Sequence, residues 1–389
     1  MKYVFVLGRN PLLSAAEIFS RFEREGAGIL SYEMKRNGMI VDAEKAVDIF
    51  LIMKELGGTI AAGKVLFSGS AEEVFKKISS EAIYAGREIK MTYSLINFAD
   101  AGIERRVLEA MKENFKKEGL KARFKGVGGT IKMQGGSIAS GSPSKIMLRD
   151  MNYFVFDGNS GISFGILESC ADAKESEKRD IGKPERREEL AISPRLAKIL
   201  INLSGAKKGG IVLDPFCGIG VILQEALLMG INAVGVEIDA SAAKNAKKNI
   251  EWLKKNYSVS AECEVINADS RKARLRKNID GIATEPALGK LLKRVPSREE
   301  AQEMAKGFES LIAKVLENVK KYLKKGGKIA FTSPLIKTNA EKVGCDIGRI
   351  ASSAGLKVYE IAGLKEAAFP IREFREGQIV GREIWVLTA

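Results

Sequence analysis

Residues 211–239, IVLDPFCGIGVILQEALLMGINAVGVEID, constrain the fold of this chain more than any other stretch. Two short apolar runs, 211–213 and 233–236, flank a glycine turn and a segment with helical character, 221–229. Short apolar runs on either side of a helix are typical of a β-α-β unit in a parallel sheet. The sequence therefore predicts a doubly wound α/β domain built around this stretch.

The turn between the two runs is suited to the close approach of a ligand. Gly218 and Gly220 permit sharp backbone bends. Glu237 ends the second run, where a carboxylate can accept both hydroxyls of a ribose. A nicotinamide cofactor is disfavoured, because no glycine stands three residues after Gly220 to complete the dinucleotide fingerprint. The stretch predicts a nucleoside-containing ligand, with an ordinary strand-turn-helix as the alternative.

Composition narrows the class of protein. At 389 residues the chain is long enough for two or three domains. We see no apolar run of membrane-spanning length and no signal peptide. The four cysteines are widely spaced and indicate neither a disulfide framework nor a metal site, which favours a reducing cytoplasm. The absence of histidine excludes histidine-based catalysis.

The charge balance points to a class of partner. The chain holds 63 Lys and Arg against 49 Asp and Glu, a formal net charge of +14. An excess of this size indicates a nucleic-acid partner. A lysine-rich surface on a thermally stable protein would give the same balance, and charge alone does not separate the two readings.

Hydrophobic patterning divides the chain into four parts. Residues 1–68 show the order βαββαβ of a ferredoxin-like domain, with strands at 2–7, 29–32, 38–41 and 60–67 and a second helix at 43–56. Residues 69–168 form another module, with helices at 71–80 and 102–119, strands at 88–96, 145–149, 152–156 and 162–167, and a glycine-rich exposed turn at 126–141. Residues 169–192 are polar and charged, which predicts a linker or an extended arm.

The fourth part, residues 193–389, contains the β-α-β unit. Ser193 and Pro194 are expected to cap a helix over 195–203. Further helices are predicted at 241–255, 297–322 and 347–355, and strands at 262–266, 280–283, 327–332 and 357–361. A hairpin arm after Gly377 closes the chain. This alternation predicts a mainly parallel sheet with an antiparallel last strand.

With these elements in place, the chain resembles the THUMP-domain tRNA guanine-N(2)-methyltransferases over essentially its full length. The motifs that carry the likeness are SPRLAKILINLSG, LDPFCGIG, the acid in GVEID and the acid in NADS. The resemblance implies a Rossmann-like class I methyltransferase domain over 193–389. A ferredoxin-like domain and a THUMP RNA-binding α/β domain would precede it.

The resemblance also implies S-adenosylmethionine as the cofactor. Carried over by position, Asp214, Phe216, Gly218 and Gly220 would line the methionine end of the cofactor, Glu237 would hold the ribose and Asp269 would face the adenine. The remaining cofactor-lining residues by the same likeness are Pro215, Cys217, Ile238 and Ser270.

The catalytic motif departs from the family pattern. The family usually shows Asp or Asn, then two prolines and an aromatic residue. Here the stretch is Glu285-Pro286-Ala287-Leu288, with a longer acid and no aromatic residue. Glu285 and the Pro286 carbonyl could each accept one N–H of a guanine amine, and Leu288 could contact the flipped base. The alternative is a strand-to-loop turn with no catalytic role.

Basic residues would meet the RNA. The expected contacts are Lys121, Arg123, Lys125 and Lys145 in the THUMP module, and Lys290 and Lys293 beyond the catalytic loop. The expected partner is tRNA, without a membrane, and the resemblance allows a small activator subunit. Two other functions stay open at this point: methylation of ribosomal RNA, and tRNA binding by a protein whose methyltransferase domain is degenerate.

Overall fold

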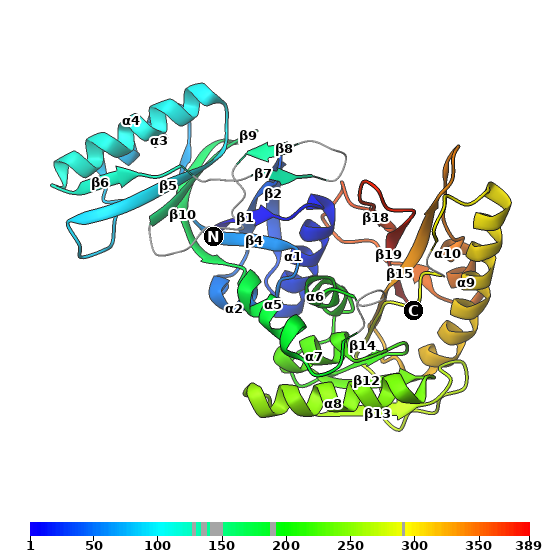
Figure 1. Cartoon of the computed structure of the whole chain (residues 1–389). Coiled ribbons are helices and arrows are strands. Elements are labelled where there is room, and N and C mark those ends of the chain that lie inside the picture. Colours follow the sequence, from blue (N-terminus) through cyan, green and yellow to red (C-terminus); the bar gives the residue numbers. More distant parts are fainter. Residues whose placement is uncertain (127–129, 134–137, 141–150, 187–191, 290–291) are drawn as a thin grey trace. The chain divides into compact units, whose positions relative to one another are not determined.

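The computed structural model describes residues 1–126, 130–133, 138–140, 151–186, 192–289 and 292–389. It divides into two compact α/β units, each built on a mixed sheet (Figure 1). The first unit comprises Met1–Ala15 and Glu25–Ala173, and the second comprises Ala16–Arg24 and Lys174–Ala389. Within the described residues, the helices lack the length and apolarity that a membrane span needs.

The first unit contains one eight-stranded sheet in the order β2-β3-β1-β4-β10-β9-β5-β6. Its strands are β1 (Lys2–Leu7), β2 (Ile29–Lys35), β3 (Gly38–Ala43), β4 (Thr59–Gly69), β5 (Lys90–Phe98), β6 (Lys121–Phe124), β9 (Met151–Gly158) and β10 (Gly161–Cys170). The first four strands pair antiparallel, in the element order that the sequence predicts. β4 also pairs with β10, so strands from residues 1–68 and 69–168 share one sheet.

Helices α1 (Pro11–Glu25), α2 (Ile49–Glu55), α3 (Ala71–Ser80) and α4 (Ala101–Lys117) connect these strands. α3 and α4 pack against β5, β9 and β10 through a core that includes Tyr93, Phe115 and Tyr153. The prediction of a helix over 43–56 began too early. Ala43 ends β3, and α2 starts only after Asp48, whose carboxylate accepts the backbone N–H groups of Phe50 and Leu51 as an N-cap.

Two stretches differ from their predicted character. The expected glycine-rich turn at 126–141 contains two short antiparallel strands, β7 (Thr130–Lys132) and β8 (Ile138–Ser140). The expected linker at 169–192 contains the end of β10 and a helix, α5 (Ala173–Gly182). In α5, Arg179 is buried and its guanidinium pairs with Glu225 at 3.2 Å. The polar sequence of this stretch suggests a solvent-exposed charge, but in the structure the charge is paired inside the second unit. The strand predicted at 145–149 lies outside the described residues.

The second unit has its main strands in the order β13-β12-β11-β14-β15-β19-β17. These are β11 (Ile211–Asp214), β12 (Asn232–Glu237), β13 (Cys263–Asn267), β14 (Gly281–Thr284), β15 (Lys328–Lys337), β17 (Lys357–Val358) and β19 (Val380–Thr388). The strands from β13 to β15 are parallel, and β19 joins antiparallel, as the alternation of elements predicts. Two short strands that the sequence pattern does not predict, β16 (Lys342–Val343) and β18 (Ile371–Glu373), pair with β15 and β19.

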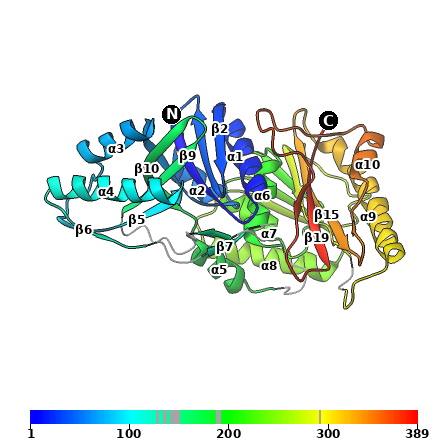
Figure 2. The same ribbon diagram turned by 90° about the horizontal axis from the view of Figure 1, so that it is seen from above.

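Helices cover both faces of this sheet. α6 (Pro194–Leu203), α7 (Val221–Leu228) and α8 (Ala240–Asn256) lie on one face, and α9 (Arg298–Val319) and α10 (Ile347–Ser353) on the other (Figure 1, Figure 2). Ser193 caps α6 by accepting the Leu196 N–H, as expected from the sequence. Residues 16–24 of α1 belong to this unit too, where the Ser20 hydroxyl donates to the Asn202 carbonyl at 2.7 Å.

Candidate active site

The acidic residues of the predicted site meet at one edge of the second sheet. β11 ends at Asp214, β12 ends at Glu237, and Glu285 follows directly after β14. Because these three strands are parallel neighbours, their carboxyl ends lie along the same edge. Ligands of open α/β sheets bind outside this edge.

The glycine turn leaves room for a ligand. Gly218 and Gly220 have φ angles of +52° and +86°, in the left-handed region that favours glycine. Gly220 is the N-cap of α7, and its N–H donates to the Cys217 carbonyl at 2.7 Å. A Cβ built on Gly218 would meet no atom within 4 Å, so the space beside this turn is open.

Glu237 ties the glycine turn to the end of β12. Its Oε2 accepts the Gly218 N–H at 2.8 Å, and its Oε1 accepts the Asp239 N–H at 2.9 Å. Each carboxylate oxygen can accept a further hydrogen bond, so two ribose hydroxyls can still be bound. Ile238, the next residue, is 66% exposed and offers an apolar surface beside it. These two acceptor oxygens and the open turn fit the nucleoside part of S-adenosylmethionine.

Asp214 links the glycine turn to the end of β14. Its buried Oδ1 accepts the Thr284 hydroxyl at 2.6 Å and the Phe216 N–H at 3.1 Å. Burial raises the pKa of Asp214 to about 7, with the charges of Glu237 and Glu285 adding to the rise and the two hydrogen bonds opposing it. Thr284 was not anticipated from the sequence, although it directly precedes Glu285.

The third predicted cofactor segment contains Asp269 and Ser270, and the side chains of both already have partners within the protein. Asp269 accepts both the Nε and Nη2 groups of Arg271 at 2.6 to 3.0 Å, together with the Arg271 N–H. These hydrogen bonds lower the pKa of Asp269 to about 2. The carboxylate thus has little acceptor capacity left for an adenine. Ser270 is buried, and its hydroxyl donates to the Pro215 carbonyl. Cys217 is buried as well, which raises the pKa of its thiol.

In the loop after β14, the predicted catalytic acid is held by a side chain distant in the sequence. Glu285 is 9% exposed, and its Oε1 accepts Arg382 Nε at 2.6 Å and the Thr332 hydroxyl at 3.3 Å. Pro286 is buried, and Leu288 is half-buried against the core under α9 and α10. The sequence analysis missed Arg382 on β19, because nothing in the local pattern connects it with a loop 97 residues away.

Asn249, a side chain of α8, is hydrogen-bonded to the backbone of the glycine turn. The Asn249 amide is fully buried, and its Nδ2 donates to the carbonyl of Ile219 at 2.9 Å and to that of Glu185 at 3.1 Å. Its Oδ1 accepts the Glu185 N–H at 3.0 Å. Glu185 belongs to the stretch predicted as a linker, so part of that stretch is attached to the turn that it precedes.

The predicted RNA contacts are only partly described. Lys121, Arg123 and Lys125, in and just after β6, are exposed, and so is Lys293. Lys145 and Lys290 lie outside the described residues. The sequence analysis also passed over residues 271–277, RKARLRK, whose five cations are exposed around a buried Ala273. A simple count of charges along the sequence would have found this run.

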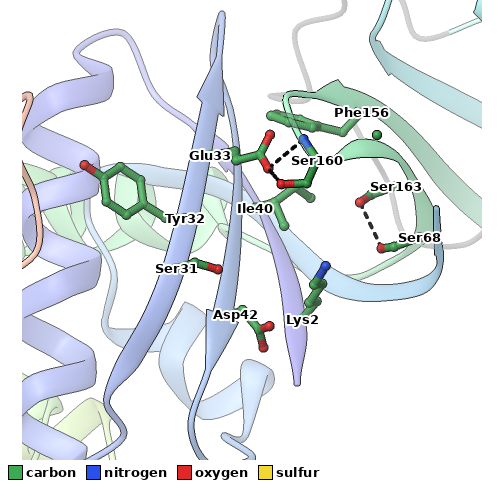
Figure 3. A pocket seen from close by; sticks show the side chains of 11 residues that line it. Lys2, Ser31, Tyr32, Glu33, Ile40, Asp42, Ser68, Phe156, Ser160 and Ser163 are labelled. Atoms are coloured by element: carbon green, nitrogen blue, oxygen red, sulfur yellow. Dashed lines mark hydrogen bonds between the residues drawn. The ribbon is translucent and has the colours of Figure 1, made fainter. Parts of the chain in front are cut away.

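A separate pocket lies in the first unit (Figure 3). Its acids are already paired. Glu33 accepts the N–H groups of Asn159 and Ser160, and Asp42 pairs with the N-terminal ammonium group at 3.1 Å. The hydroxyls of Ser68 and Ser163 hydrogen-bond to each other at 3.0 Å. These contacts hold strands together and supply none of the predicted site residues.

Comparison with known proteins bears on the second unit. The family model described as "RMKL-like, methyltransferase domain" matches residues 184–343. The probable tRNA (guanine(10)-N2)-dimethyltransferase of Methanothermococcus thermolithotrophicus is 34% identical over 146 residues, which are 36% of this chain and 79% of that protein. The chain belongs to the tRNA guanine-N2-methyltransferase family. This confirms the expected family, its methyltransferase domain and S-adenosylmethionine as the cofactor of that domain.

Other members of the family align over smaller shares of their length. The tRNA (guanine(10)-N2)-dimethyltransferase of Methanothermobacter thermautotrophicus is 35% identical over 37% of this chain and 39% of its own. The protein of the same name from Methanocaldococcus jannaschii is 27% identical over 59% of this chain and 61% of its own. Among solved structures, TrmN from Thermus thermophilus aligns with 100% of this chain and 99% of its own, at 15% identity and a TM-score of 0.46.

Proposed function

We propose that this protein transfers a methyl group from S-adenosylmethionine to the exocyclic N2 amine of a guanosine in tRNA. The observation that carries the proposal is the similarity to a named tRNA guanine-N2 enzyme over most of that enzyme's length. The site geometry supports it. Glu237 and the open glycine turn stand beside an acid, Glu285, at the edge where a cofactor and a base would meet.

The chemistry asked of the protein is orientation. When bound, S-adenosylmethionine supplies a methyl group already activated on a sulfonium sulfur. The guanine amine is a poor nucleophile because its lone pair is delocalised into the ring. Glu285 and the Pro286 carbonyl can each accept one of its N–H groups, which directs the lone pair at the methyl carbon. As the new nitrogen–carbon bond forms, the methyl–sulfur bond breaks and its electron pair stays on sulfur, while the nitrogen loses a proton that Glu285 would accept.

We assign the first 168 residues to RNA binding, with a ferredoxin-like domain over 1–68 and a THUMP domain over 69–168. The exposed cations Lys121, Arg123 and Lys125 flank Phe124, which is 39% exposed, and this mixture suits a phosphate backbone and an unpaired base. Lys145, Lys290 and Lys293 remain expected contacts, and we add the cationic run 271–277. The cytoplasmic location and a small activator subunit also stay predictions.

The proposal is tested by methyl transfer from labelled S-adenosylmethionine to bulk tRNA, followed by nucleoside analysis. We expect label in N2-methylated guanosine. Glu285→Ala is expected to lower the single-turnover rate by roughly a hundredfold or more if its contact strengthens in the transition state, and Glu285→Gln by less. Cofactor affinity measured by calorimetry serves as the control, because it should hardly change. If a parallel assay labels ribosomal RNA and not tRNA, the substrate is ribosomal RNA instead.

A second candidate is a tRNA-binding protein without methyltransferase activity. The observation in its favour is that Glu285 is already paired with Arg382 and that no aromatic residue follows Pro286. It predicts tRNA binding with no methyl transfer to any RNA. Micromolar cofactor affinity would argue against it, because a degenerate domain has no reason to retain that affinity.

A further inference from the structure

The pair formed by Glu285 and Arg382 has a role beyond stability, and the inference rests on the proposed function. We propose that Arg382 is a positioning residue. It fixes the Glu285 carboxylate so that one oxygen, Oε2, stays available to accept an N–H of the target amine.

The two carboxylate oxygens are unequally occupied. Oε1 takes two donors, Arg382 Nε at 2.6 Å and the Thr332 hydroxyl at 3.3 Å. Among the described residues, Oε2 has one hydrogen-bond contact, with Arg382 Nη2 at 3.5 Å, which is the limit of a hydrogen bond. A carboxylate oxygen can accept two hydrogen bonds, so Oε1 is filled and Oε2 retains acceptor capacity.

The sheet places Arg382 where it can do this. In the antiparallel pair of β15 and β19, Arg382 stands opposite Pro334, two residues along the strand from Thr332. Both donors to Oε1 therefore come from neighbouring strands of a rigid sheet. The side chains of Glu285 and Arg382 are 9% and 23% exposed, so water screens the pair only weakly.

The longer acid explains why such a clamp is needed. Glutamate has one more rotatable bond than aspartate, so its carboxylate is less well placed by the backbone alone. The planar guanidinium fork restricts the orientation of the carboxylate that it binds. Glu373 stands opposite Arg382 on β18, so a second negative charge also acts on the guanidinium. The departure from the family motif at Glu285 is thereby matched by a partner on the last strand.

Arg382→Gln and Arg382→Lys test the proposal in the full-length protein. For Arg382→Gln we expect the single-turnover rate to fall roughly tenfold to a hundredfold, as for a misplaced catalytic group, while KM for tRNA and cofactor affinity hardly change. Arg382→Lys should recover only part of the rate, since an ammonium group restores the charge but lacks the fork.

Arg372→Gln is the matched control. Arg372 on β18 pairs with the buried Glu383 at 3.1 Å, so this variant also removes an arginine from a buried acid in the same sheet. It should leave the single-turnover rate unchanged. If Arg382→Gln fails to fold, Glu285→Gln with Arg382→Gln gives a neutral pair, which should react at the rate of Glu285→Gln alone if Arg382 acts only through Glu285.

The outcomes separate the inference from the proposed function. An active wild type with an Arg382→Gln variant of unchanged rate overturns the inference and leaves the function standing. A double variant slower than Glu285→Gln alone also overturns it, because Arg382 would then act independently of Glu285. A wild type that transfers no methyl group to tRNA overturns the proposed function, and the inference with it.

Discussion

The glycine turn after β11 and the loop after β14 hold their acids by different means. Glu237 is held by two backbone N–H groups, from residues 19 and 2 positions away in the sequence. Glu285 is held by two side chains, from residues 47 and 97 positions away. The first arrangement matches the family pattern, and the second accompanies a departure from it.

This difference indicates which part of the site tolerates substitution of the surrounding side chains. Backbone donors are present whatever side chains stand around them, so the geometry of Glu237 depends mainly on the course of the chain through Gly218. Side-chain donors can be lost in one substitution. We therefore expect the cofactor half of the site to be robust and the catalytic half to depend on particular residues such as Arg382.

The comparison between the two acids predicts that Glu237→Ala has the largest effect on cofactor affinity. It would remove the two charge-assisted hydrogen bonds that we expect Glu237 to accept from the ribose, and it leaves the Gly218 N–H without its acceptor. Affinity for S-adenosylmethionine measured by calorimetry should fall roughly tenfold or more, while the fold survives. Glu285→Ala is the matched control, because its carboxylate would face the base. Equal affinity in Glu237→Ala and wild type would remove this acid from the cofactor site.

A second test of the cofactor half is the pH dependence of cofactor binding. Burial raises the pKa of Asp214 to about 7, so below that pH the apo protein holds a proton there. A cationic ligand beside Asp214 favours the ionised form, and binding must then release the proton. Affinity should rise as pH increases from 5 to 7, by up to about tenfold per unit, and level off above 7. Asp214→Asn should bind with no such dependence.

The same group makes a prediction about stability. Because the folded pKa of about 7 lies above the ordinary 3.8, the stability that Asp214 contributes is fully present below about pH 4 and is lost as pH rises to about 7. Asp214→Asn should therefore gain stability relative to wild type as the pH is raised across this window. Thermal melts of both proteins at pH 5 and pH 8 give the comparison, and parallel pH dependence would contradict the burial argument.

Asn249→Ala tests whether the glycine turn depends on its support. It leaves the Ile219 and Glu185 carbonyls without their shared donor. The free energy of unfolding should fall by about 1–3 kcal/mol, the cost of leaving a buried polar group unsatisfied. Cofactor affinity should change less than in Glu237→Ala if backbone donors make the turn robust. A larger loss of affinity than in Glu237→Ala would show that the turn relies on this side chain.

The smallest effect is expected for Leu288→Tyr. Stacking on an aromatic ring is worth about 1–3 kcal/mol per base, so a ring that the pocket accepts should lower KM for tRNA by roughly fivefold or more. Leu288→Val, which changes size without adding a ring, is the control. A rise in KM for Leu288→Tyr, with the fold intact, would mean that the half-buried position has no room for a ring.

Local chemistry explains what could be predicted. The strands around 211–213 and 233–236, the glycine turn and the cap of α6 all follow from periodicity and turn residues within a few positions of each other. The start of α2 was missed although Asp48 signals it, because Ala43, Ala46 and Val47 before it stand at helical spacing. The helix α5 was missed because polar composition conceals the buried pair of Arg179 and Glu225.

By itself, the sequence determined the order of the main elements, the family and the acids at the strand ends. Each of these depends on residues that are close together in the sequence. Only the tertiary structure decided what each acid meets. Pairing of β15 with β19 brings Arg382 to Glu285, and packing of α8 brings Asn249 to the glycine turn. A contact between residues far apart in the chain exists only after the sheet has formed, so no local pattern records it.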